Sequence, residues 1–85
     1  MVKPRIDQRY DSGDEIHVGD RVRYAGDTGT IVLVIDRAEY SPEYPEKDWS
    51  HYGTGFMIEM PRYARVMLEK ADEDLELLGR ATQTI

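Results

Sequence analysis

Apolar and polar residues alternate along short stretches of this chain, which is the pattern of half-buried β-strands. Residues 21–24 alternate arginines with Val22 and Tyr24. Residues 56–60 place every second side chain, beginning with Phe56, on one apolar face. Both segments therefore predict antiparallel strands with one solvated face.

The strongest strand signal is the apolar run over residues 30–35. Thr30 is followed by β-branched residues and leucine up to Asp36, and such residues favour the pleated conformation. A run without alternation is typical of a strand that is buried on both faces. The preceding residues 25–29 are rich in turn formers, so they predict a hairpin connection to the strand over 21–24.

Residues 62–79 fit two patterns. With a period of two residues, Val66 and Leu68 face inward and a second short strand follows. With the helical period of about 3.6 residues, an apolar stripe forms, and Pro61 and Gly79 stand where a helix begins and ends. Intrinsic propensity favours the helix, whereas the neighbouring strands need antiparallel partners, which favours strands.

The whole chain of 85 residues predicts one small domain. Residues 1–15 have no period and mix Pro, Ser and Gly with charges, which indicates a flexible N-terminal arm. We expect one β-domain over residues 16–80 and a C-terminal tail over residues 81–85. The fold expected is mostly β, a small antiparallel barrel or a bent sheet of about five strands; the alternative is an α+β fold with a helix over residues 62–78.

A resemblance to a known class of folds supports the barrel. The succession of strand, glycine-rich turn and strand in GDRVRYAGDTGTIVLVID resembles the opening of small β-barrels of the Src-homology-3 type, which include the KOW modules of ribosomal and transcription proteins. The matching positions are Gly19, Asp20 and Gly29, and the closing ADEDLELLGR resembles the last turn and strand of such barrels. The resemblance covers residues 16–36 and 72–80. It implies a small barrel and, through the KOW modules, a role beside nucleic acid or the ribosome.

Residues 36–55 carry the candidate binding chemistry. A loop of this length is uncommon in a compact domain unless it binds something, and aromatic rings give interfaces much contact area at small entropic cost. The candidate partner-binding residues are Glu39, Tyr40, Glu43, Tyr44, Glu46, Asp48, Trp49 and Tyr52. The alternative is that Trp49, Tyr40 or Tyr44 caps an open end of the barrel.

The charge balance decides between classes of partner. The chain has 11 Lys and Arg against 17 Asp and Glu, a formal net charge of −6. Such a surface steers a basic protein toward it and repels nucleic acid at low salt. A compact acidic domain with an aromatic, carboxylate-rich loop is also similar in style to the small immunity proteins that neutralise bacterial nuclease toxins.

We therefore expect a non-catalytic protein-binding module, an immunity or inhibitor protein of a basic partner such as a toxin. The alternative is a KOW-like module associated with nucleic acid or the ribosome. The arginines that would serve the alternative are Arg21, Arg23, Arg37, Arg62 and Arg65.

Other classes lack the residues that they need. Cysteine is absent, which excludes disulfides and thiolate-bound metals. His17 stands on the polar side of a short strand expected over residues 16–18, and His51 lies in the acidic loop; neither has the positioned partners of acid–base catalysis. We expect no enzyme activity, no cofactor and no metal site. The longest apolar run is far shorter than the roughly 20 residues that span a bilayer, and no secretory signal opens the chain, so we expect a cytoplasmic, bacterial protein away from membranes.

Overall fold

The structure, a computed structural model, describes residues 8–62 and 64–80. Residues 1–7 of the expected arm and residues 81–85 of the expected tail lie outside these ranges. The elements in chain order are β1 (Arg21–Tyr24), β2 (Asp27–Val34), the 3-10 turn η1 (Ile35–Arg37), β3 (Glu39–Tyr40), α1 (Glu46–Trp49), the 3-10 turn η2 (Ser50–Tyr52), β4 (Phe56–Met60), β5 (Ala64–Leu68) and β6 (Leu75–Gly79).

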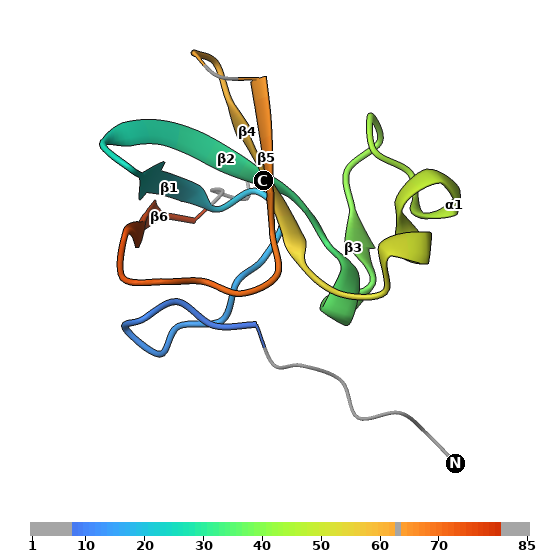
Figure 1. Cartoon of the computed structure of the whole chain (residues 1–85), viewed down its shortest axis with the longest axis horizontal. Helices are drawn as coiled ribbons and strands as arrows, with labels where there is room; N and C mark the ends of the chain where they lie inside the picture. The colour runs from blue at the N-terminus through green and yellow to red at the C-terminus, as the bar shows by residue number, and fades with distance from the viewer. Residues whose placement is uncertain (1–7, 63, 81–85) are drawn as a thin grey trace, which may run out of the picture.

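Six strands in this part of the chain form one antiparallel sheet (Figure 1). The strand order is β5-β4-β2-β1-β6, and β3 pairs with the end of β2. This confirms the expected mostly β fold. The sheet is not closed into a barrel, because β5 and β6 lie at the two ends of the order.

Residues 62–78 contain strands, so the alternative with a helix is not adopted. Every residue of β5 pairs with one of β4, from Leu68 opposite Phe56 to Ala64 opposite Met60. β6 pairs with β1 on the other side of the sheet. The partners that the neighbouring strands supply therefore outweigh the helix propensity of this segment.

The central strands β2 and β4 separate two apolar clusters. The main core consists of Tyr10, Ile16, Val22, Ile31, Val34, Phe56, Ile58, Met60 and Leu75. The second cluster consists of Val32, Leu33, Tyr44 and Met57. Because side chains alternate along a strand, β4 directs Phe56 and Ile58 into the main core and Met57 into the second cluster. Residues 31–34 of the apolar run are buried and contribute to both clusters, as expected, whereas Thr30 and Ile35 at its ends are half-buried.

The turn between β1 and β2 is shorter than the expected connection over residues 25–29. Tyr24 pairs with Asp27, so Ala25 and Gly26 alone form the turn. Both have positive φ, 52° and 88°, as in the type I′ turn whose twist matches that of the strands.

Residues 8–15, which we expected in a flexible arm, pack against the sheet. Gln8 and Tyr10 are buried, and a backbone bridge joins Arg9 to Glu15. The chain gives little sign of this, because single apolar residues among charges have no period that marks them as core.

Residues 16–18 form no strand, which corrects the expectation for His17. Ile16 is buried in the main core, and the chain then turns at Gly19. The backbone N–H of Gly19 donates to the Ile31 carbonyl, and the N–H of Ile31 donates to the backbone carbonyl of Asp20. Hydrogen bonding to β2 therefore begins at this turn, with Gly19.

Candidate protein-binding site

Residues 36–55 form an excursion between β2 and β4 that lies to one side of the sheet (Figure 1). We call this segment the acidic loop. Its ends meet, because the N–H of Ile35 donates to the Gly55 carbonyl at 2.9 Å. Tyr44 of this loop belongs to the second cluster, together with residues of β2 and β4. Tyr40 and Trp49 pack against the same cluster.

Asp36 fixes the base of the acidic loop. Its buried carboxylate accepts hydrogen bonds from the Gln8 amide (2.8 Å), the Thr54 hydroxyl (2.8 Å) and the Gly55 N–H (2.9 Å). Burial acts to raise the pKa of Asp36, but the hydrogen bonds to the charged form outweigh it, and the pKa lies below its ordinary value. The ionised side chain thus joins both ends of the loop to Gln8 in residues 8–18, which we call the N-terminal segment.

Glu39, which we expected to face a partner, contacts the protein's own N-terminal segment. Its carboxylate accepts a hydrogen bond from the Val18 N–H (2.9 Å) and lies 2.8 Å from His17 Nδ1. On the other side of the ring, His17 Nε2 lies 3.0 Å from Glu15. The hydrogen bonds with Glu39 and Glu15 raise the pKa of His17 above its ordinary value. Glu39 therefore holds β3 in place.

Tyr44 anchors the acidic loop in the second cluster. Its side chain is only 7% exposed, and its hydroxyl donates to the Glu59 carboxylate at 2.8 Å. That hydrogen bond raises the pKa of Tyr44. The Arg65 guanidinium carbon lies 5.7 Å from the centre of the ring, within the range of a cation–π contact. Tyr40, half-buried, packs against the same cluster.

The aromatic rings continue outward from Tyr44. The Trp49 ring lies edge-on to Tyr44 with centroids 6.0 Å apart, and Tyr52 stacks on Trp49 at 5.6 Å and 18°. The His51 ring lies 4.4 Å from Tyr52. Tyr52 is 53% exposed. We call Tyr44, Trp49 and Tyr52 the aromatic ladder, because they lead from the second cluster to the surface.

The backbone that carries the aromatic ladder is short and sharply bounded. Pro45, whose ring fixes φ, precedes α1. Gly53 ends η2 with a φ of 82°, a value that glycine adopts without strain. The four residues of α1 and the turn of η2 therefore fit between the anchor at Tyr44 and the return to β4.

Carboxylates surround this helical segment in the sequence and reach solvent. Glu43, Glu46 and Asp48 are exposed, and Lys47 stands between the last two. The acidic loop has five carboxylates against two cations, hence a net charge of −3. A basic group approaching Tyr52 would meet negative potential.

The eight predicted residues thus fall into three groups. Glu43, Glu46, Asp48 and Tyr52 are exposed, Glu39, Tyr40 and Trp49 are half-buried, and Tyr44 is buried. Sequence reasoning missed Asp36 and Glu59, which position the loop, and it named Arg65 only for nucleic-acid binding. Alternation along β4 was a usable signal for Glu59, because it places that residue on the face opposite Phe56.

Most of the arginines named for nucleic-acid binding contact groups of the protein itself. Arg37 is half-buried, and its guanidinium donates to the carbonyls of Ile16 (2.9 Å) and Gln8 (3.0 Å). Arg23 forms an ion pair with Glu76 at 3.1 Å. Arg65 lies over Tyr44, and Arg62 lies 4.0 Å from Asp27. Four of the five arginines therefore contact groups of the protein itself.

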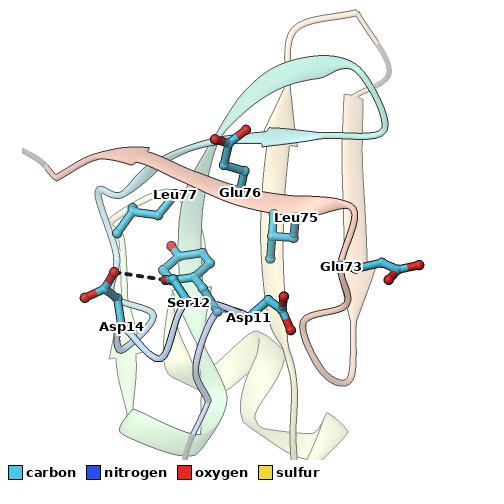
Figure 2. Close-up of a pocket in the computed structure, with 8 residues that line it drawn as sticks. Asp11, Ser12, Asp14, Glu73, Leu75, Glu76 and Leu77 are labelled. Carbon is cyan, nitrogen blue, oxygen red and sulfur yellow. Dashed lines mark hydrogen bonds between the residues drawn. The ribbon is translucent and has the colours of Figure 1, made fainter.

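A second acidic feature is a hollow of about 420 Å³ between the turn over residues 10–14 and β6 (Figure 2). The carboxylates on its lining are those of Asp11, Asp14, Glu73 and Glu76. Figure 2 shows Leu75 and Leu77 pointing from β6 toward the turn, whereas Glu76 points to the opposite side of the strand. The carboxylates therefore do not converge on one point. Within the described ranges, no group of three or more His, Asp or Glu side chains is placed to hold a metal ion.

Comparisons with protein-family models, curated proteins and solved structures found no match. No helix in the described part of the chain combines the length and the apolarity needed to cross a membrane. The class that the fold defines is therefore a small, mostly β domain with an open antiparallel sheet and an acidic, aromatic-rich loop.

Proposed function

We propose that this chain is a non-catalytic protein-binding module that engages a basic partner through the outer part of the acidic loop. The contact surface consists of the stacked Trp49 and Tyr52 rings with Glu43, Glu46 and Asp48. The observation that carries the proposal is the placement of Tyr52, a large ring that is 53% exposed and yet held by stacking on Trp49. A ring that is already ordered loses little conformational entropy when a partner covers it.

The chemistry of the site favours a cationic partner. The whole chain carries −6 and the acidic loop −3, which raises the rate of encounter with a basic surface. The protein already uses one such contact, because Arg65 lies over the face of Tyr44. We infer that an arginine or lysine of the partner contacts the exposed part of the Tyr52 ring.

Two finer proposals follow. The small size and the acidic balance support a protein of the immunity or inhibitor type, with a toxin as the basic partner. The strand order, with β6 beside β1 and a meander through β1, β2, β4 and β5, is compatible with a relative of the Src-homology-3-like folds.

The two histidines fit a binding role better than catalysis. His17 is engaged by two carboxylates that hold the backbone, and the His51 ring contacts Tyr52. These contacts support the choice of a non-catalytic module.

The single tryptophan of the chain, Trp49, lies in the proposed surface and reports on it by fluorescence. Titration with an oligoarginine peptide should change the Trp49 emission of the wild type. Tyr52→Ala should weaken the apparent affinity about tenfold, which corresponds to about 1.4 kcal/mol. Because Tyr52 is exposed, the free energy of unfolding should change by only about 0.5 kcal/mol.

Leu78→Ala is the matched control, since Leu78 is an exposed apolar residue on β6, outside the acidic loop. It should leave the affinity unchanged. Equal weakening by both substitutions, or no weakening by Tyr52→Ala, would contradict the proposal. Tight binding of double-stranded DNA with a steep dependence on salt would favour the nucleic-acid alternative instead.

A further inference from the structure

His17 lies between two carboxylates that belong to different parts of the chain. Nδ1 is 2.8 Å from Glu39 in β3, and Nε2 is 3.0 Å from Glu15 in the N-terminal segment. The side chain is 37% exposed, so solvent protons reach it. The ring therefore bridges the N-terminal segment and the start of the acidic loop.

This geometry depends on the charge of the imidazole. A protonated ring has an N–H on both nitrogens and donates to both carboxylates. A neutral ring has one N–H, and its second nitrogen then directs a lone pair at a carboxylate oxygen. Only the imidazolium satisfies both contacts.

The surrounding charges differ on the two sides of the ring. Glu15 also lies 3.3 Å from Arg9 and 3.9 Å from Arg37, so it keeps two cations when His17 is neutral. Glu39 then keeps the Val18 N–H as a hydrogen-bond donor, but loses the charge of His17. Loss of the proton therefore weakens the contacts on both sides, and Glu39 loses the charge of its His17 partner.

Asp20, Arg80 and Arg37 also carry charges near this segment. Asp20 accepts a hydrogen bond from the His17 backbone N–H and forms an ion pair with Arg80. Arg37, on η1, opposes the positive charge of the His17 ring, and the carboxylates Glu39 and Glu15 outweigh it. The balance of all these groups favours the protonated ring.

We propose that Glu15, His17 and Glu39 form a proton-controlled clasp that tightens the contact of β3 with the N-terminal segment while His17 is charged and loosens it when His17 loses its proton. β3 has two residues, Glu39 and Tyr40, and pairs only with β2 among the described strands. The clasp therefore adds to the pairing with β2 and to the Val18–Glu39 hydrogen bond in fixing the start of the acidic loop.

The pH range follows from the sign of the shift. A pKa raised in the folded state means that the clasp is fully formed below the ordinary value of 6.5 and is lost as the pH rises through the higher folded-state value. The consequence for partner binding rests on the proposed function. The clasp itself does not.

The test is an NMR titration of the free protein from about pH 5 to pH 9. The His17 ring should titrate with a midpoint above 6.5, and the backbone N–H signals of Val18 and Tyr40 should change with the same midpoint. Glu39→Gln should lower that midpoint. His17→Gln should abolish the transition at Tyr40.

Glu43→Gln is the matched control, because it removes an exposed carboxylate from the same loop without touching His17. It should leave the His17 midpoint in place. An equal shift in Glu43→Gln, a wild-type midpoint at or below 6.5, or a Tyr40 signal that ignores His17 would each overturn the clasp. The wild-type titration decides this even if a variant fails to fold.

Titration with the oligoarginine peptide separates the clasp from the proposed function. If both hold, the wild type should bind more weakly as His17 loses its proton, and His17→Gln should show no such dependence. A peptide that does not bind at any pH contradicts the proposed function, whereas the NMR result still decides the clasp.

Discussion

At the scale of single residues, backbone strain lies where the chain must reverse. Ala25 and Ala38 have positive φ values of 52° and 55°, a conformation that costs an alanine roughly 1–2 kcal/mol. Ala25 forms the turn between β1 and β2, and Ala38 ends η1 before β3. At both positions the pairing of the neighbouring strands requires a positive φ, although alanine does not favour that conformation.

Replacing the strained turn residue should stabilise the protein. Ala25→Asn creates the Asn-Gly pair that type I′ turns prefer, because asparagine tolerates positive φ. We expect the free energy of unfolding to rise by about 0.5–1 kcal/mol, measured by urea denaturation. Ala25→Val, a β-branched residue at the same position, should lower it. A gain for both would show that the turn does not have this conformation.

At the scale of elements, the pairing of β2 with β4 controls the fold. A β-carbon added at Gly29 would lie 2.7 Å from Ile58 Cγ2 and 2.9 Å from the Glu59 carbonyl oxygen. The two strands approach this closely because position 29 has no side chain. The absence of a side chain at Gly29 therefore allows Ile58 to pack in the main core. It also positions β4 so that Glu59 can accept the hydrogen bond from Tyr44.

Gly29→Ala should therefore be costly. We expect a loss of about 1–3 kcal/mol in the free energy of unfolding, since the backbone carbonyl of Glu59 cannot move aside. Gly79→Ala, on β6, is the control, because an added β-carbon there meets no atom within 4 Å. Thermal denaturation of both variants checks this, and similar midpoints would refute the close packing at Gly29.

At the scale of the whole molecule, Asp20 joins segments that are far apart in the chain. Its carboxylate accepts hydrogen bonds from the Tyr10 hydroxyl (2.7 Å), the His17 N–H (2.9 Å) and the Arg80 guanidinium (3.2 Å). Asp20 is 1% exposed. The buried Asp20 carboxylate thereby links the N-terminal segment to Arg80, the residue that follows β6.

Tyr10 links this junction to alkaline stability. Burial, and then the hydrogen bond to Asp20, raise the pKa of Tyr10 above its ordinary value of 10.0. The stability that this group contributes is present below pH 10 and is lost as the pH rises further, because the unfolded chain releases the proton first.

Tyr10→Phe should lower the free energy of unfolding by about 1–3 kcal/mol at neutral pH, because Asp20 loses a donor. The difference from the wild type should shrink as the pH rises above about 10. Denaturant unfolding at a series of pH values measures this. A difference that stays constant across the alkaline range would mean that Tyr10 does not remain protonated in the fold.

Local pattern predicted the strands that alternate or are continuously apolar. Val22 and Tyr24, the run from Thr30, and Phe56 with its alternate neighbours were placed on the correct faces, because strand periodicity is a property of the chain alone. The same reasoning named the acidic loop as an aromatic and acidic excursion. It could not say which ring is buried, because that depends on the second cluster beneath the loop.

The sequence by itself determined the β-rich class, the face of each central strand and the negative charge of the loop, since these follow from residue types and their spacing. Only the tertiary structure decided that the segment after β4 forms the strands β5 and β6 and not a helix, that the sheet stays open, that Tyr44 is buried while Tyr52 is exposed, and that Glu39 contacts His17. Each of these depends on a contact between residues distant in the chain, and no local period records such a contact.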